Sequence, residues 1–465
     1  MKPALPALAT ARIDAPTGPS LLLLAHTAPT AEPEPQVSSR VLLLFVLTYA
    51  AYAILYLARK PVSVVKTTLE SELKMSVAAL GRIDSALLLA YTAGQLLLGK
   101  TVAIFGRTLP LVLAYALSGA STAAFGLASS SGAMTLAWAA SGFFAAPANP
   151  LMVILIGELF PASLRATAIG AWASSQQLGG VVANLISAYV LGKSGWRAVF
   201  LVSGGLIAAF APLLAIALPL CMPRGANTTP SKGAAPAKPV GTTGKSVKSA
   251  SALSVPGSPA VAAGYTFVKM ARYCLMFWLP FFLSKYCGLS APAAASVATT
   301  FDIGGAIGNF GAGVLCDRLY GGRMLLASLH LCLATAIGFA AWGGLCMATA
   351  GQPPPLGAHV ALISLIGFFI AGPDGILGGG ASRMLVDYSP ETAGDRMLYA
   401  AVSGMVNGCG SIGALMQGLF TSQLVGAVGW AGLYFTLALA TLAGAGVLLP
   451  AVAVEDEAQK RLKAK

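Results

Sequence analysis

Two apolar segments of this sequence carry the same stripe of polar and charged residues, the second 213 residues after the first. In each segment, three such residues stand at positions i, i+4 and i+7, which fall on one face of an α-helix because successive residues turn by about 100°. The two triplets are Tyr52, Tyr56 and Arg59, and Tyr265, Lys269 and Arg272. An arginine at the centre of a membrane helix costs about 2.5–3.5 kcal/mol. Its presence in both stripes predicts a shared anionic ligand, bound between two parts of the chain.

An organic phosphate is the anion that these residue types suit best. Arginine stays charged, and its planar guanidinium matches two phosphate oxygens at once. Tyrosines one helical turn away offer hydroxyl groups and amphipathic walls for a sugar or polyol. A second interpretation of Arg59 stays open, because Lys60 and Pro61 follow directly and a nearby loop would let the charge reach the membrane surface. Arg272 lies within a run of apolar and aromatic residues, with no loop close to it.

Asp302 is the candidate counter-ion for these cations. It lies inside an apolar segment, where an unpaired carboxylate is costly, so we expect it to pair with Lys269 or Arg272 or to face water. Such a pair, broken and remade as phosphate binds, would couple occupancy to movement. Asp84 and Asp374 are further acids in apolar segments, and we interpret Asp84 as a helix-end residue rather than a ligand.

The elements that position these residues are predicted to be membrane-spanning helices. The chain is 56% hydrophobic and only 10% charged, with a mean hydropathy of +0.77. Apolar stretches recur from about residue 41 to residue 452, the first near 41–58. At about 20 residues per span, this length accommodates about twelve helices. We therefore predict an all-α integral membrane protein with twelve transmembrane helices.

The distribution of charge predicts how the chain is divided and oriented. Segment 222–258 is rich in Pro, Gly, Ser, Thr and Lys and contains no acid, which indicates a flexible linker on the cytoplasmic side. We expect both termini on that side too. The predicted parts are a disordered cytoplasmic tail (1–40), an N-terminal six-helix bundle (41–221), the basic linker (222–258), a C-terminal six-helix bundle (259–452) and a cytoplasmic tail (453–465). An organellar transit peptide is the alternative for the first tail.

Internal similarity indicates that the two bundles arose by duplication. Arg165 precedes Gln176 by 11 residues, as Arg396 precedes Asn407, which makes Gln176 and Asn407 matched candidates for substrate binding. The pair Gly195-Trp196 opens the last helix of the first bundle, as Gly429-Trp430 does in the second. Two parallel six-helix halves with pseudo-two-fold symmetry are the arrangement of the major facilitator superfamily.

A loop of the form G-x-x-x-D-R-x-x-x-x-R, typical of that superfamily, begins at Gly313. Its charged residues, Asp317, Arg318 and Arg323, are predicted to form a cytoplasmic latch that bonds helix ends across a closing gate. The alternative is that they are loop residues that only follow the positive-inside rule.

The chain resembles the organophosphate:phosphate antiporters, in particular their eukaryotic sugar-phosphate/phosphate exchanger branch. The resemblance is carried by five segments: Tyr56 to Lys66, Leu80 to Asp84 with Tyr91, Lys269 to Pro280, Phe301 to Asp317, and Asn407 to Ala414. It implies that Arg59 and Arg272 clamp phosphate. It also implies that Tyr52, Tyr56 and Tyr91 line the site, that Asp302 matches a helix-8 acid, and that Gln176 stands where bacterial members have a histidine.

The function predicted from these features is exchange of glycerol 3-phosphate or a hexose phosphate for inorganic phosphate by alternating access. The alternatives are a proton-coupled organic anion symporter, with Asp302 as the relay, and a non-transporting phosphate sensor. No catalytic constellation is present and the cysteines and histidines lack metal-binding spacing, so we expect neither an enzyme nor a metal or cofactor. Basic residues lie in loops rather than on one face, which argues against nucleic acid. We expect a monomer in the lipid bilayer of the endoplasmic reticulum or another endomembrane, with plastid and plasma membranes as the alternatives.

Overall fold

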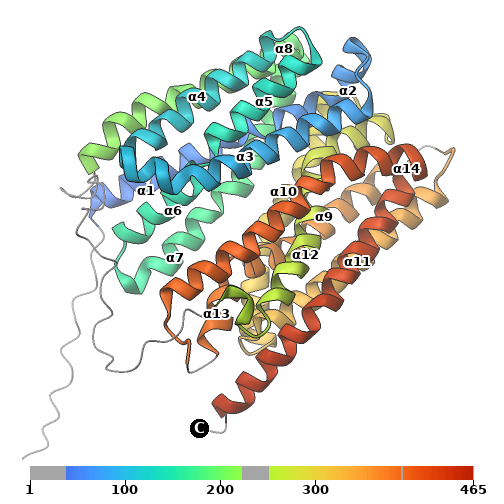
Figure 1. Ribbon diagram of the computed structural model, residues 1–465. Helices are drawn as coiled ribbons and strands as arrows, with labels where there is room; N and C mark the ends of the chain where they lie inside the picture. Colours follow the sequence, from blue (N-terminus) through green and yellow to red (C-terminus); the bar gives the residue numbers. More distant parts are fainter. Residues whose placement is uncertain (1–37, 222–250, 353, 389–390, 464–465) are drawn as a thin grey trace, which may run out of the picture. The chain divides into compact units, whose positions relative to one another are not determined.

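All regular structure in the described part of the chain is helical (Figure 1). The computed structural model describes residues 38–221, 251–352, 354–388 and 391–463. The α-helices are α1 Ser39–Ile54, α2 Pro61–Leu73, α3 Val77–Phe105, α4 Thr108–Leu127, α5 Ser131–Ala145, α6 Ala148–Leu159, α7 Ala162–Ala173, α8 Ser175–Cys221, α9 Ser258–Lys285, α10 Ala291–Leu319, α11 Met324–Ala348, α12 Leu356–Gly375, α13 Ala381–Asp387 and α14 Arg396–Lys463. The shorter elements are the 3₁₀ turns η1 Leu55–Ala58 and η2 Ala252–Ser254 and the π-helical turn η3 Ile376–Gly380.

Eight helical segments of the described residues are long and apolar enough to cross a membrane. Two of them contain a break, at Gly195 in α8 and at Gly429 in α14, where φ is 77° and 67°. Glycine adopts positive φ without steric cost, so the chain turns there, directly before Trp196 and Trp430, as the repeated Gly-Trp pairs predict. The count of twelve spans stays a prediction, which these two breaks and the long helices α3 and α10 support.

The first apolar span continues well past Arg59. Helix α1, turn η1 and helix α2 together form an apolar span of 35 residues, Ser39–Leu73, rather than ending near residue 58 as expected. Pro61 is the first residue of α2, a position where its missing N–H costs no helical hydrogen bond. Lys60 and Pro61 are buried, so Arg59 lies within a helical span and not beside a loop.

The helices of residues 39–221 form one group and those of residues 251–463 form a second (Figure 1). Helices α2, α3 and α8 of the first group contact α9, α10 and α14 of the second. The approach of α3 to α14 is especially close, because a Cβ atom on Gly81 would lie 2.3 Å from the carbonyl oxygen of Gly418. Small residues permit such close approach between membrane helices. The two groups agree with the predicted bundles, whose bounds stay a prediction.

We expect Gly81→Leu to lower the free energy of unfolding by about 1–3 kcal/mol, the usual cost of overpacking. The added side chain would meet backbone atoms of α14, which cannot turn away as a flexible side chain can. The measurement is denaturant unfolding of the purified protein in detergent micelles. Gly170→Leu is the control, because a Cβ atom at Gly170 meets no atom of the described residues within 4 Å. Equal stabilities of the two variants would contradict the close contact.

The last helix runs on past the predicted boundary at residue 452. Helix α14 extends to Lys463, and the Glu455 carboxylate accepts hydrogen bonds from the backbone N–H groups of Leu325 (3.1 Å) and Leu326 (2.9 Å) at the start of α11. Arg323 forms an ion pair with Asp456. These contacts attach the beginning of the predicted C-terminal tail to α11. Most of the predicted tail 1–40 and linker 222–258 lies outside the described residues.

Candidate substrate-binding site

The first stripe forms a polar and aromatic cluster around Arg59. The Arg59 guanidinium carbon lies 4.5 Å from the ring centroid of Tyr91 and 5.6 Å from that of Tyr56. The Tyr56 hydroxyl donates a hydrogen bond of 3.1 Å to Gln176 Oε1, and the Tyr52 ring packs edge-on against Tyr56 at 6.0 Å. Among the described residues, no carboxylate lies within 4.0 Å of Arg59. Aromatic faces attract its charge without neutralising it.

The second stripe converges on an acid that the sequence left without a role. Asp374 Oδ1 lies 3.2 Å from Lys269 Nζ and accepts a hydrogen bond of 3.2 Å from the Tyr265 hydroxyl. Asp374 Oδ2 lies 3.3 Å from Arg272 Nε. All three residues of the second stripe therefore share one carboxylate, which stands near the end of α12.

Asp302 does not pair with Lys269 or Arg272, so this expectation is wrong. Its Oδ2 lies 2.8 Å from Lys60 Nζ and accepts a hydrogen bond of 3.3 Å from Asn184 Nδ2. The reason is the packing of α10, which brings Asp302 against α2 and α8 so closely that a Cβ atom on Gly180 would lie 2.9 Å from its carboxylate. The Lys60–Asp302 ion pair is buried and joins the two groups of helices.

Tyr273 is a further aromatic residue beside the second stripe, and it was not among the candidates predicted from the sequence. Lys269 Nζ lies 5.1 Å from the Tyr273 ring centroid. The signal was present in the spacing, because Tyr273 follows Lys269 by four residues and so shares its helix face.

Asn407 lies at the edge of this arrangement. Its side chain is exposed, and its Nδ2 donates to the carbonyl oxygens of Gly378 in η3 (3.1 Å) and of Ser403 (3.0 Å). A Cβ atom on Gly378 would in turn lie 2.2 Å from the Tyr265 hydroxyl. Asn407 therefore contacts the turn that holds the second stripe rather than the stripe itself, whereas its predicted counterpart Gln176 bonds Tyr56 directly.

The three predicted latch residues lie at the junction of α10 and α11. Asp317 and Arg318 are exposed on the last turns of α10, and Arg323 precedes α11 and pairs with Asp456 of α14. In the described part of the chain, none of them forms an ion pair with the helices of residues 39–221. Their action as a latch stays a prediction for a state in which that side of the protein is closed.

Asp84 belongs to a second buried ion pair and is not the helix-end residue that we expected. Its Oδ2 accepts a hydrogen bond of 2.5 Å from Lys66 Nζ, and both side chains are fully buried. Lys66 also donates to the Phe277 carbonyl oxygen at 2.9 Å and lies 3.7 Å from the Trp278 ring centroid. Lys66 of α2 therefore bonds α3 and α9 together, because its ammonium group has three N–H donors.

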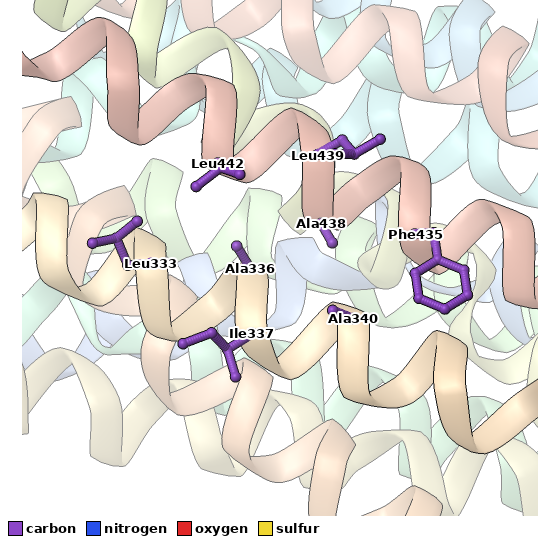
Figure 2. Close-up of a pocket in the computed structure, with 8 residues that line it drawn as sticks. All are labelled: Leu333, Ala336, Ile337, Ala340, Phe435, Ala438, Leu439 and Leu442. Carbon is purple, nitrogen blue, oxygen red and sulfur yellow. The ribbon is translucent and has the colours of Figure 1, made fainter.

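A cavity of about 460 Å³ lies away from all these charges, between α11 and the second part of α14 (Figure 2). Side chains of the two helices face each other across it, and all are apolar: Leu333, Ala336, Ile337, Ala340, Phe435, Ala438, Leu439 and Leu442. It has no donor for a phosphate oxygen, so it is separate from the candidate site.

The helices and the paired cationic stripes together define the class of protein as a multi-pass integral membrane transporter. Solved structures agree on the fold. A D-xylose-proton symporter matches with a TM-score of 0.65 at 15% identity, covering 88% of this chain and 96% of the symporter. A bacterial homolog of the human lysosomal transporter Spinster matches with a TM-score of 0.61 at 17% identity, covering 91% of this chain and 98% of the homolog.

The chain belongs to the Major Facilitator Superfamily, whose family model matches residues 48–373. It is similar to "Putative glycerol-3-phosphate transporter 2" of Arabidopsis thaliana, at 26% identity over 89% of this chain and 86% of that protein. It is also similar to sugar phosphate exchanger 3 of Bos taurus, at 24% identity over 86% of this chain and 90% of that protein. Glucose-6-phosphate exchanger SLC37A1 of Mus musculus matches at 25% identity over 85% of this chain and 90% of that protein. The predicted family resemblance and major facilitator fold are confirmed.

Proposed function

We propose that this protein is a secondary active transporter that exchanges an organic phosphate, glycerol 3-phosphate or a hexose phosphate, for inorganic phosphate. The observation that carries the proposal is the charge of Arg59, which lies over the rings of Tyr56 and Tyr91 with no carboxylate within 4.0 Å in the described structure. A cation without a carboxylate is costly inside a membrane and is retained where a ligand supplies the anion. The names of the relatives, which are phosphate-ester transporters and exchangers, support the same substrate class.

The proposed mechanism moves the two groups of helices against each other around the bound phosphate. Arg59 and Arg272 would hold the phosphate from opposite groups, with Lys269 adding a third positive charge. Tyr52, Tyr56, Tyr91, Tyr265 and Gln176 would surround the organic part, with Asn407 at the margin. The Lys60–Asp302 ion pair joins the groups near the site, so its opening and closing would link occupancy to movement. At the cytoplasmic ends of the helices, the latch would be formed by Asp317, Arg318 and Arg323.

We further propose two six-helix bundles, at 41–221 and 259–452, joined by a cytoplasmic linker, with both termini in the cytoplasm. The host membrane would be the endoplasmic reticulum or another endomembrane. The lack of acid and the five basic residues of segment 222–258 support this orientation by the positive-inside rule. A cysteine introduced into that segment should be labelled by an impermeant thiol reagent only from the cytoplasmic side.

Purified protein in liposomes tests the exchange directly. Vesicles preloaded with inorganic phosphate should take up labelled phosphate, glycerol 3-phosphate or glucose 6-phosphate, and vesicles without internal phosphate should not. The transport needs no ATP, because the gradients of the two substrates supply the free energy. Uptake that persists without internal phosphate and rises at acidic external pH would support proton-coupled symport instead. Binding of phosphate without any uptake would support a sensor.

A further inference from the structure

Asp374 occupies the place of an anion between the cations of the second stripe. Its two oxygens are both engaged, Oδ1 with Lys269 and Tyr265 and Oδ2 with Arg272. Arg272 offers this carboxylate only its Nε, so in the described structure its two terminal nitrogens stay available for a second anion. All three charged side chains are partly accessible, with exposed fractions of 13–20%. A carboxylate is the side-chain group most similar to a phosphate edge in charge and oxygen spacing.

The backbone around Asp374 is irregular. Pro373 precedes it and donates no backbone hydrogen bond, and the π-helical turn η3 begins two residues after it. Such π-helical turns are rare and occur often at functional sites. The Tyr265 hydroxyl reaches Asp374 only because Gly378 in this turn has no side chain. The cluster therefore depends on a local distortion of the helix, not on regular packing.

The charges of the whole site add up to a value that suits one kind of ligand. Four cations, Arg59, Lys60, Lys269 and Arg272, face two carboxylates, Asp302 and Asp374, which leaves a net charge of two positive. A phosphate monoester carries about −1.5 to −2 at pH 7. Without Asp374, the site would carry one positive charge more than such a dianion can neutralise.

We propose that Asp374 is an internal competitor of the substrate, a specificity-determining carboxylate that neutralises Lys269 and Arg272 in the empty transporter and yields them to a phosphate dianion. This inference rests on the proposed phosphate exchange. The empty site, with unbalanced cations in a membrane, would otherwise be costly and would hold phosphate too tightly for rapid release. Asp374 therefore weakens binding and speeds turnover.

The test is Asp374→Asn, assayed as phosphate:phosphate exchange in liposomes with inorganic phosphate as the only substrate. The amide keeps the shape but removes the competing charge, so the KM for phosphate should fall about ten-fold. The maximal exchange rate should fall too, because release becomes slower. If Asp374 only held Lys269 and Arg272 in position, its replacement by Asn would instead raise the KM for phosphate.

Two further variants serve as controls for the effect of charge at Asp374. Asp387→Asn removes a carboxylate of α13 that pairs with the exposed Arg383, and it should leave both parameters unchanged. Lys269→Met combined with Asp374→Asn restores the net charge, and its KM should return towards the wild-type value. A KM for phosphate that is unchanged or raised in a folded Asp374→Asn protein overturns the inference. The proposed function still holds in that case if the wild-type protein exchanges phosphate. Wild-type protein that exchanges no phosphate overturns both.

Discussion

Arg59→Lys should reduce phosphate exchange by about 100-fold while the protein stays folded. Lysine keeps the charge but replaces a planar fork of donors with a single ammonium group, which cannot bond two phosphate oxygens in parallel. Hydrogen bonds to charged groups contribute about 1.5–3 kcal/mol, and a loss near 2.8 kcal/mol corresponds to a factor of about 100. Arg59 is the sensitive position because no carboxylate in the described structure shares its guanidinium, so the ligand is its natural partner.

The measurement is the initial rate of exchange in liposomes at equal protein content. Arg272→Lys should give a loss of similar size, because the atom that contacts Asp374 is its Nε and the proposal places its terminal nitrogens on the phosphate. Arg383→Lys is the matched control, since Arg383 is an exposed residue whose partner Asp387 lies one helical turn away. If Arg59→Lys or Arg272→Lys exchanges phosphate at the wild-type rate, the bidentate clamp is not how this protein binds phosphate.

Lys66→Met should lower the free energy of unfolding by about 3–5 kcal/mol, the largest stability effect that we expect. Removal of one partner of a buried ion pair leaves the other charge buried without compensation, and here both side chains are fully buried. Lys66 also loses its bond to the Phe277 carbonyl oxygen and its contact with the Trp278 ring, so α2 is released from α9. Denaturant titration in detergent micelles measures the change.

Lys285→Met provides the comparison, because Lys285 at the end of α9 forms an ion pair with a residue of α2. Lys285 pairs with Glu70 at 2.6 Å, but its side chain is 41% exposed, and ion pairs of this kind contribute about 0–1 kcal/mol. The double variant Lys66→Met with Asp84→Leu removes both buried charges and should recover much of the lost stability. A small effect of Lys66→Met, equal to that of Lys285→Met, would refute the assignment of Lys66 as a buried connector.

The two stripes show which features of the site can be predicted from residue spacing alone. Spacing alone put Tyr56 and Arg59 on one helix face, and Lys269 and Arg272 on another, because helical periodicity is a local property. The repeated Gly-Trp pairs predicted where the last helix of each half begins, and the structure has a break with positive φ at Gly195 and at Gly429. The Arg-Lys-Pro sequence was misleading, because Pro61 begins a new helix as easily as it ends one.

The partners of the charges are what the sequence did not determine. Asp302, Asp84 and Asp374 are each an acid in an apolar segment, and their neighbours along the chain do not say which cation each one pairs with. Composition and periodicity by themselves determined an all-helical membrane protein with two cationic faces. Only the tertiary structure decided that Asp302 takes Lys60, Asp84 takes Lys66 and Asp374 takes both Lys269 and Arg272. The physical reason is that an ion pair forms across a few ångströms of space, and which helices approach that closely depends on the packing of the whole chain.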